Sequence, residues 1–140
     1  MPSAEISVLA VVLAAIASFL FGGLWYGAFS KPWMEAAGMH PEDTSAPAGG
    51  AVLAPYIIAF AALVVMAWVL AAMIERSGMA NVTIWNGVMT GAIIWAGFVI
   101  TTLAVNHAFQ NQKRALTLID GGHWLGVLLI QGAIIGLIGG

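Results

Sequence analysis

Apolar residues fill four long stretches of this chain, over about residues 6–29, 52–74, 82–105 and 122–138, and polar residues gather in the links between them. A helix needs roughly 20 apolar residues to cross about 30 Å of hydrocarbon, and the stretches approach that length. Backbone groups must pair within a segment in lipid, and the period-two alternation of barrel strands is absent. The pattern predicts an all-α polytopic membrane protein, with residues 1–140 forming a single four-helix transmembrane bundle.

The links differ in character. The first, "SKPWMEAAGMHPEDTSAPAGG", is the longest, and Pro32 and Gly38 suit the start and end of a helix. A short interfacial helix is therefore predicted over Pro32–Ala37, with Trp33 and Met34 facing lipid. The second link, "ERSGMAN", predicts a tight turn, and the third, "NHAFQNQKRALTLIDGG", predicts a polar link of medium length.

Composition narrows the class of protein. Of the 140 residues 61% are hydrophobic and only 7% are charged, whereas a soluble domain has about a quarter charged. The first apolar stretch has no Lys or Arg before it and is longer than a signal-peptide core, so it is predicted to be a retained helix. A net charge of −2 without a basic cluster argues against a nucleic-acid partner, and the absence of cysteine excludes disulfides and thiolate metal sites. The bilayer is the expected partner.

Orientation follows from the Lys and Arg residues of the links. Four helices place both termini on one side of the membrane, and that side holds only Arg76. The opposite side holds Lys31, Lys113 and Arg114. The chain is therefore predicted to have both termini outside and its two longer links in the cytoplasm.

An aromatic group marks the end of the first predicted helix. Trp25 and Tyr26 lie there, and Lys31 and Trp33 follow within a few residues. Trp and Tyr concentrate at membrane interfaces and Lys extends toward phosphate, so the group is first of all an interfacial anchor. The alternative is a ligand-binding site.

Polar residues from two later segments reach the same membrane face. Asn106 and His107 end the third predicted helix, and Asp120 and His123 precede or open the fourth. Together with the aromatic group they form a candidate ligand-binding cluster at the cytoplasmic face. Histidine is a common ligand of metals and haem, so a haem- or metal-binding protein is one alternative. No third ligand is evident, since His40 lies in the long loop, and no metal or cofactor is assigned.

Polar residues within the membrane are few and uncharged. Asn86, Thr90 and Thr101 fall with Gly97 on one stripe of the third predicted helix, and Gln131 lies in the middle of the fourth. A buried amide needs a partner, so Gln131 is predicted to face another helix. These four residues either support packing or line a path, which gives a second alternative: a transporter or channel for a small neutral solute. Proton-coupled transport is disfavoured because no carboxylate lies near the middle of a span.

Glycines four residues apart recur five times, for example Gly23/Gly27, Gly87/Gly91 and Gly132/Gly136. Such pairs let helices approach closely, within the bundle or between copies in a homo-oligomer. Common enzyme motifs are absent, and no catalytic residue is assigned. The leading interpretation is a non-enzymatic membrane protein that acts through helix packing, oligomerisation and binding of lipid or a partner.

Three segments carry a family resemblance. "GGLWYGAFSKPWMEAAG" has a Gly-x-x-Trp-Tyr motif followed by Lys-x-Trp-Met, and "GFVITTLAVNHAFQNQK" and "ALTLIDGGHWLGVLLIQGAIIG" add to the likeness. The chain resembles the family named domain of unknown function 1761, over most of its length except residues 41–50. The resemblance implies a small four-helix inner-membrane protein of unknown function. It brings no catalytic residues, but it implies a role beyond anchoring for Trp25, Tyr26, Lys31, Trp33, Asn106 and His123.

Overall fold

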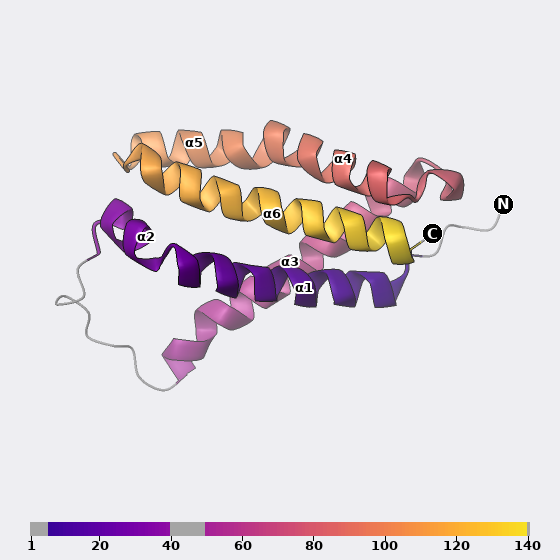
Figure 1. Ribbon diagram of the computed structural model, residues 1–140, viewed down its shortest axis with the longest axis horizontal. Coiled ribbons are helices and arrows are strands. Elements are labelled where there is room, and N and C mark those ends of the chain that lie inside the picture. The colour runs from indigo at the N-terminus through magenta and orange to yellow at the C-terminus, as the bar shows by residue number, and fades with distance from the viewer. Residues whose placement is uncertain (1–5, 40–49, 140) are drawn as a thin grey trace.

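The computed structural model describes residues 6–39 and 50–139, and every regular element in these ranges is helical (Figure 1). This confirms the all-α class. The elements are α1 (Val8–Ala28), α2 (Ser30–Ala37), α3 (Gly50–Arg76), α4 (Ile84–Ile94), α5 (Ile100–Phe109) and α6 (Arg114–Ile138), with a 3₁₀ turn η2 (Met79–Asn81) and a π-helical turn η3 (Trp95–Val99).

Four helical segments are long and apolar enough to cross a membrane, as predicted. They are Val8–Ala28, Ala51–Arg76, Ile84–Phe109 and Arg114–Ile138. The short helix after the first span is also present, as α2. It ends at Gly38, which has a φ of 71° and so adopts the left-handed conformation that glycine accepts at a helix end. The chain is a multi-pass membrane protein by the length and composition of these helices.

The third link is shorter than predicted. Helix α6 begins at Arg114 rather than near Gly122, so the connection to α5 covers only residues 110–113. The segment reads as polar because Thr117 and Asp120 lie three residues apart on one face of the helix. Leu116, which is buried, and Gly121 pack against the rest of the bundle. The predicted polar link therefore ends at residue 113, and residues 114–121 form the start of a helix with one polar face and one buried face.

Helix α6 is the centre of the bundle. It contacts α1, α2, α3, α4 and α5, and it runs between α1 on one side and the α4–α5 arm on the other (Figure 1). Its buried residues Leu128 and Ile135 join a core that includes Val11, Leu70 and Ile74. In a bilayer these contacts stabilise the bundle through close packing, because lipid tails are as apolar as the side chains.

Helices α4 and α6 cross with their backbones in contact. A Cβ atom added at Gly87 would overlap the carbonyl of Gly132, and one added at Gly132 would overlap the carbonyl of Gly87. One turn away, a Cβ at Gly91 would lie 2.5 Å from the carbonyl oxygen of Leu128. The glycine pairs Gly87/Gly91 and Gly132/Gly136 thus allow two helices of the same chain to approach closely. Dispersion contacts between the close backbones then hold the helices together.

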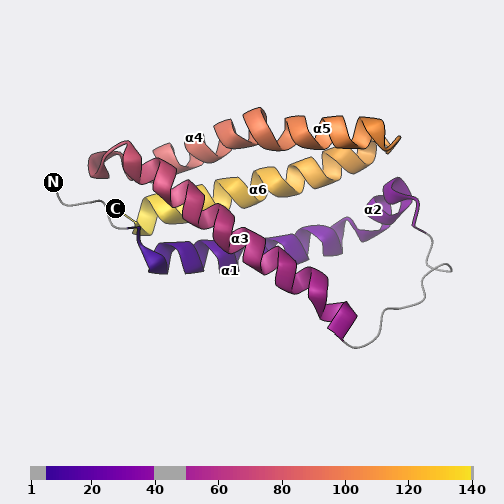
Figure 2. The ribbon, with the colours of Figure 1, turned by 180° about the vertical axis from the view of Figure 1, so that it is seen from behind.

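Helix α3 lies across the bundle at an angle. Figure 2 shows it running diagonally, with its first turns away from α6. Its later residues Leu63, Ala67 and Leu70 are buried, whereas residues 51–58 are all exposed. The first half of α3 therefore diverges from the rest of the bundle.

Gln131 ties three helices together at membrane depth. Its side chain is fully buried, and its amide nitrogen donates to Ser18 Oγ of α1 and to the Leu63 carbonyl of α3, each at 3.1 Å. The expectation that Gln131 faces other helices is confirmed. An interhelical hydrogen bond of this kind contributes about 0.6 kcal/mol on average and up to about 1.7 kcal/mol.

Candidate functional site

The carboxylate of Asp120 is the centre of a polar cluster near one end of the bundle. Asp120 lies six residues into α6, about 9 Å along the helix axis. Its Oδ1 atom accepts hydrogen bonds from the Tyr26 hydroxyl at 2.6 Å and from the Trp33 indole nitrogen at 3.2 Å. Because α1 and α2 each supply a donor, one carboxylate joins three helices. Hydrogen bonds to an ionised acceptor are the stronger kind.

A histidine on α5 faces the other carboxylate oxygen. His107 Nε2 lies 4.0 Å from Asp120 Oδ2, and His107 Nδ1 lies 2.8 Å from Thr117 Oγ1. The contact with Thr117 leaves one ring nitrogen directed at the carboxylate, which orients the imidazole. We call Tyr26, Trp33, His107, Thr117 and Asp120 the Asp120 cluster.

Two further indoles bind the backbone of α6 beside the cluster. Trp25 Nε1 donates to the Ile119 carbonyl at 3.0 Å, and Trp95 Nε1 donates to the Gly121 carbonyl at 2.8 Å. The approach of Trp25 requires glycine, because a Cβ added at Gly122 would lie 2.8 Å from its ring. A Cβ at Gly121 would lie 2.7 Å from Ile100 and 4.0 Å from the Trp95 ring, so Gly121 makes room for Ile100. Both indoles form their hydrogen bond with a helix carbonyl.

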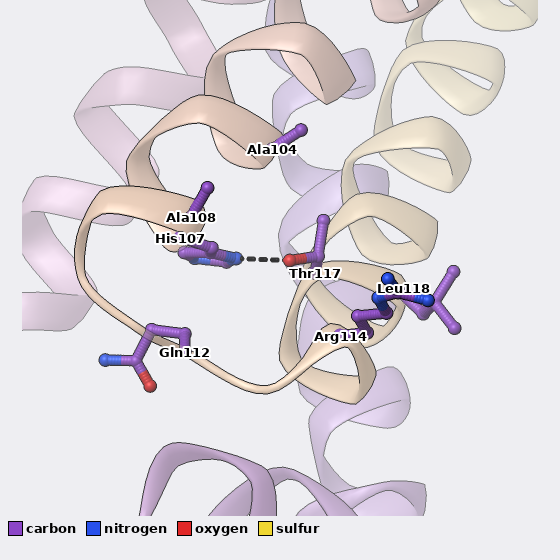
Figure 3. A pocket seen from close by; sticks show the side chains of 7 residues that line it. All are labelled: Ala104, His107, Ala108, Gln112, Arg114, Thr117 and Leu118. Carbon is purple, nitrogen blue, oxygen red and sulfur yellow. Dashed lines mark hydrogen bonds between the residues drawn. The ribbon is translucent and has the colours of Figure 1, made fainter.

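A pocket of about 450 Å³ opens next to His107, between α5 and α6 (Figure 3). Figure 3 shows His107 and Thr117 pointing toward one another across the gap, with Gln112 and Arg114 at the connecting turn. Ala104, Ala108 and Leu118 complete the lining. This α5–α6 pocket thus has polar groups at the end of the bundle and apolar groups along the helices.

His123 lies one turn beyond Asp120, in aromatic surroundings. Its ring centroid is 4.8 Å from that of Tyr26, 4.7 Å from that of Trp124 and 6.1 Å from that of Phe21, which it stacks upon. The side chain is buried, and its Nδ1 atom has no hydrogen-bond partner. His123 therefore contacts the cluster through the Tyr26 ring and not through a polar bond.

A family model, "Protein of unknown function (DUF1761)", matches residues 9–136 of the chain. The chain belongs to the DUF1761 family. No curated protein and no solved structure is similar to it. The match extends through α1 to α6, so the Asp120 cluster and the α5–α6 pocket both lie within the part of the chain that DUF1761 describes.

Five of the eight residues predicted for the cytoplasmic cluster of this DUF1761 protein come together around α6: Trp25, Tyr26, Trp33, His107 and Asp120, with His123 packed against Tyr26. The expectation that Trp33 faces lipid is wrong, because its indole N–H donates to Asp120. Lys31 and Asn106 are exposed, and no side-chain hydrogen bond joins either to another described residue.

The polar residues predicted to share a stripe do not meet around one cavity. The hydroxyls of Thr90 and Thr101 donate to carbonyls one turn back on their own helix, and Asn86 Nδ2 donates to the Asn81 carbonyl at 2.9 Å. The π turn between α4 and α5 adds a residue, which rotates Thr101 by about 100° relative to Thr90. Gln131 belongs to a different interface, with α1 and α3.

Metal-ligating side chains are not grouped in threes. Across residues 6–39 and 50–139, no three His, Cys, Asp or Glu side chains lie close enough to hold one ion. His107 and Asp120 form a pair, and His123 is separated from it by the Tyr26 ring. His40 lies outside the described residues.

Several residues of the site were missed from the sequence. Thr117 precedes Asp120 by one turn, and extending the last helix to Arg114 would have placed both on one face. Gln112 and Arg114 lie in the stretch that the sequence predicts to be a polar link, and no pattern there indicates a pocket. No sequence pattern indicates that Trp95 belongs to the site. It lies in the middle of a span, and its hydrogen-bond partner Gly121 is 26 residues later in the chain.

Proposed function

We propose that this DUF1761 protein is a non-enzymatic inner-membrane protein that binds the anionic headgroup of a phospholipid in the α5–α6 pocket. The observation that carries the proposal is the division of the pocket lining. Gln112 and Arg114 line it at the connecting turn, His107 lines it beside Thr117, and Ala104 and Leu118 line it along the helices (Figure 3). A phospholipid has the same division, with a charged phosphate joined to apolar chains.

The chemistry of the residues at the connecting turn suits a phosphate oxygen. A guanidinium offers several N–H donors and stays ionised, and it forms paired hydrogen bonds with phosphate. The Gln112 amide adds further donors. Lys113 is exposed beside Arg114 and raises the local positive potential. Basic pockets between helix ends are recognised sites for anionic lipid headgroups.

The Asp120 cluster has a positioning role in this proposal. Asp120 holds α1, α2 and α6 together, and His107 lies between its carboxylate and Thr117. Asp120 does not line the pocket, and its Oδ1 atom faces Tyr26 and Trp33 on the side of α1 and α2. The cluster keeps α5 and α6 at the separation that forms the pocket.

The orientation that supports this proposal places both termini outside. The start of α1 and the end of α6 lie at one end of the bundle, with Arg76, and Lys31, Lys113 and Arg114 lie at the other (Figure 1). Lys and Arg are enriched on the cytoplasmic side of short links. The α5–α6 pocket would then face the cytoplasmic leaflet.

A homo-oligomer is part of the same proposal. Residues 51–58 of α3 are exposed on every face of the helix, so they are available to a second copy as well as to lipid. The subunit count is obtained in the experiment that tests lipid binding.

Native mass spectrometry of the protein released from nanodiscs containing phosphatidylglycerol and phosphatidylcholine tests the proposal. Wild-type protein is expected to retain one phosphatidylglycerol per chain in preference to phosphatidylcholine. Arg114→Ala is expected to lower the retained fraction about tenfold. A parallel series with inorganic phosphate added to detergent-purified protein distinguishes a lipid headgroup from free phosphate.

Lys113→Ala is the matched control, since it removes the same charge from the neighbouring residue, which does not line the pocket. Equal losses in the two variants would mean that the lipid is held by diffuse attraction to the link. Equal retention of both lipids by the wild type would contradict the proposal.

A further inference from the structure

A second and larger cavity, of about 600 Å³, lies between α1, α3 and α6. Its lining on α3 begins at Tyr56, in the half of the helix that runs away from α6 (Figure 2). Gly23 and Gly27 of α1, Tyr56 and Leu63 of α3, and His123 and Trp124 of α6 are among its lining residues. We call it the α1–α3–α6 cavity. Cavities of roughly 300–1,000 Å³ are the usual size for small-molecule sites.

We propose that the α1–α3–α6 cavity binds a neutral, lipid-soluble molecule with a flat ring that carries carbonyl or hydroxyl groups, a molecule of the quinone class. The proposal concerns binding alone, and it is independent of the phospholipid site between α5 and α6.

The lining excludes a charged ligand. Among the described residues that line the cavity there is no Asp, Glu, Lys or Arg, and its polar groups are two tyrosines, a serine, a histidine and the indole N–H of Trp124. A phosphate or carboxylate placed here would lose its hydration without gaining a cation, which costs several kcal/mol. A neutral ligand avoids that cost, and apolar side chains cover the remaining wall.

The aromatic side chains favour a ring. Trp124 and Tyr26 stand at 69° and 51° to the His123 ring, and both line the cavity together with Phe19. Aromatic rings prefer offset-stacked or edge-to-face partners, and each such pair contributes about 0.5–1.5 kcal/mol beyond the buried area. A planar ligand can meet the faces and edges of several of these side chains at once.

His123 supplies the polar contact. Its side chain is 7% exposed, its Nδ1 atom has no hydrogen-bond partner, and its Nε2 edge faces Gly22 of the lining. A Cβ added at Gly22 would lie 2.9 Å from Nε2, so glycine leaves this edge uncovered. An imidazole N–H donates to a carbonyl oxygen, and the unprotonated nitrogen accepts from a hydroxyl. A carbonyl or hydroxyl group of a quinone-class ligand would therefore bond to Nε2, because Nδ1 is enclosed by the protein.

Access to the cavity is through lipid. Gly23 and Gly27 are exposed, and a Cβ at either position would meet nothing within 4 Å. The facing half of α3 is exposed as well. A lipid-soluble molecule would enter sideways between α1 and α3 and leave its apolar tail among the acyl chains.

Native mass spectrometry with decylubiquinone added to the purified protein tests this inference. The wild type is expected to retain one decylubiquinone per chain. Gly23→Leu fills open space in the cavity without a backbone clash, and it is expected to lower the retained fraction at least tenfold while leaving the melting temperature unchanged. His123→Leu removes the polar contact and is expected to lower retention as well.

Ala61→Leu is the control for added bulk, because Ala61 is exposed on α3 and does not line the cavity; it is expected to bind as the wild type does. Three results would overturn the inference: no quinone on the wild type, equal binding by Gly23→Leu, or a phospholipid or second copy of the chain held in its place. Loss of the phospholipid in Arg114→Ala with decylubiquinone retained would show that the two sites are separate.

Discussion

The hydroxyl of Tyr26 and the carboxylate of Asp120 lie 2.6 Å apart, although 94 positions separate them in the chain. Tyr26 is in the last turn region of α1, and Asp120 is in the second turn of α6. The same carboxylate oxygen accepts from Trp33, and the other faces His107 at 4.0 Å. One acidic side chain thus organises the end of the bundle that carries most of the basic residues.

Removing that carboxylate should weaken the bundle. Asp120→Ala leaves the Tyr26 hydroxyl and the Trp33 N–H without their acceptor, and it is expected to lower the free energy of unfolding by about 1–3 kcal/mol. Asp120→Asn keeps an acceptor oxygen and is expected to lose less than about 1 kcal/mol. Denaturation of the purified protein in mixed micelles measures both. Equal stability of wild type and Asp120→Ala would show that the cluster holds nothing together.

Trp25 should stabilise the bundle by contact with a glycine. Trp25→Phe loses the hydrogen bond to the Ile119 carbonyl and the ring atoms that face Gly122, and it should lose about 1–3 kcal/mol. Trp25→Ala leaves a larger cavity and should lose about 3–5 kcal/mol. Gly122→Ala should lose about 1–3 kcal/mol, because its Cβ would lie 2.8 Å from the indole.

A double-mutant cycle separates these effects. Gly122→Ala should be much less costly in the Trp25→Ala background, where the ring that it meets is gone. Additive losses in the double variant would mean that Trp25 and Gly122 do not act on one another.

A side chain at Gly87 or Gly132, where α4 and α6 cross, should destabilise the bundle. Gly132→Ala would place a Cβ on the Gly87 carbonyl, so the two helices must separate, with a loss of about 1–3 kcal/mol. Gly27→Ala is the control, since open space surrounds that position, and it should unfold as the wild type does. Unfolding curves that coincide for all three proteins would exclude the close crossing.

The proposed orientation predicts which turns a reagent outside the cell can reach. The chain has no cysteine, so single substitutions report unambiguously. An impermeant maleimide should label Ser77→Cys in intact cells and Gln110→Cys only after lysis, because the two residues lie in turns at opposite ends of the bundle. Labelling of Gln110→Cys alone in intact cells would reverse the orientation.

The sequence predicted the four spans, the short helix after the first and the gathering of aromatic and polar residues at one end. These features follow from the free energy of transferring side chains from water into the bilayer. That free energy depends on residue type and on the length of an apolar run, so local sequence patterns are enough to predict them. Gln131 was also predictable, because a buried amide must find a partner.

The remaining features depend on pairs of distant segments. The early start of α6 is stabilised by contacts with α1 and α5, which no local pattern contains. Trp33 reads as lipid-facing because indole suits the interface, yet an acceptor on α6 is available to it. The π turn at Trp95–Val99 places Thr90 and Thr101 on different faces of the helical segment, and the residues of this turn give no local pattern from which it could be predicted. Asn106 and Lys31 lie near the cluster in sequence order, but their side chains are exposed.

The central claim, a phospholipid headgroup between α5 and α6, is tested most directly in the native membrane. A phosphatidylglycerol analogue with a photoreactive group near its headgroup should crosslink mainly to residues 104–118, and Arg114→Ala should abolish that crosslink while Lys113→Ala preserves it. Crosslinks spread evenly over all four spans, or unchanged in Arg114→Ala, would contradict the claim.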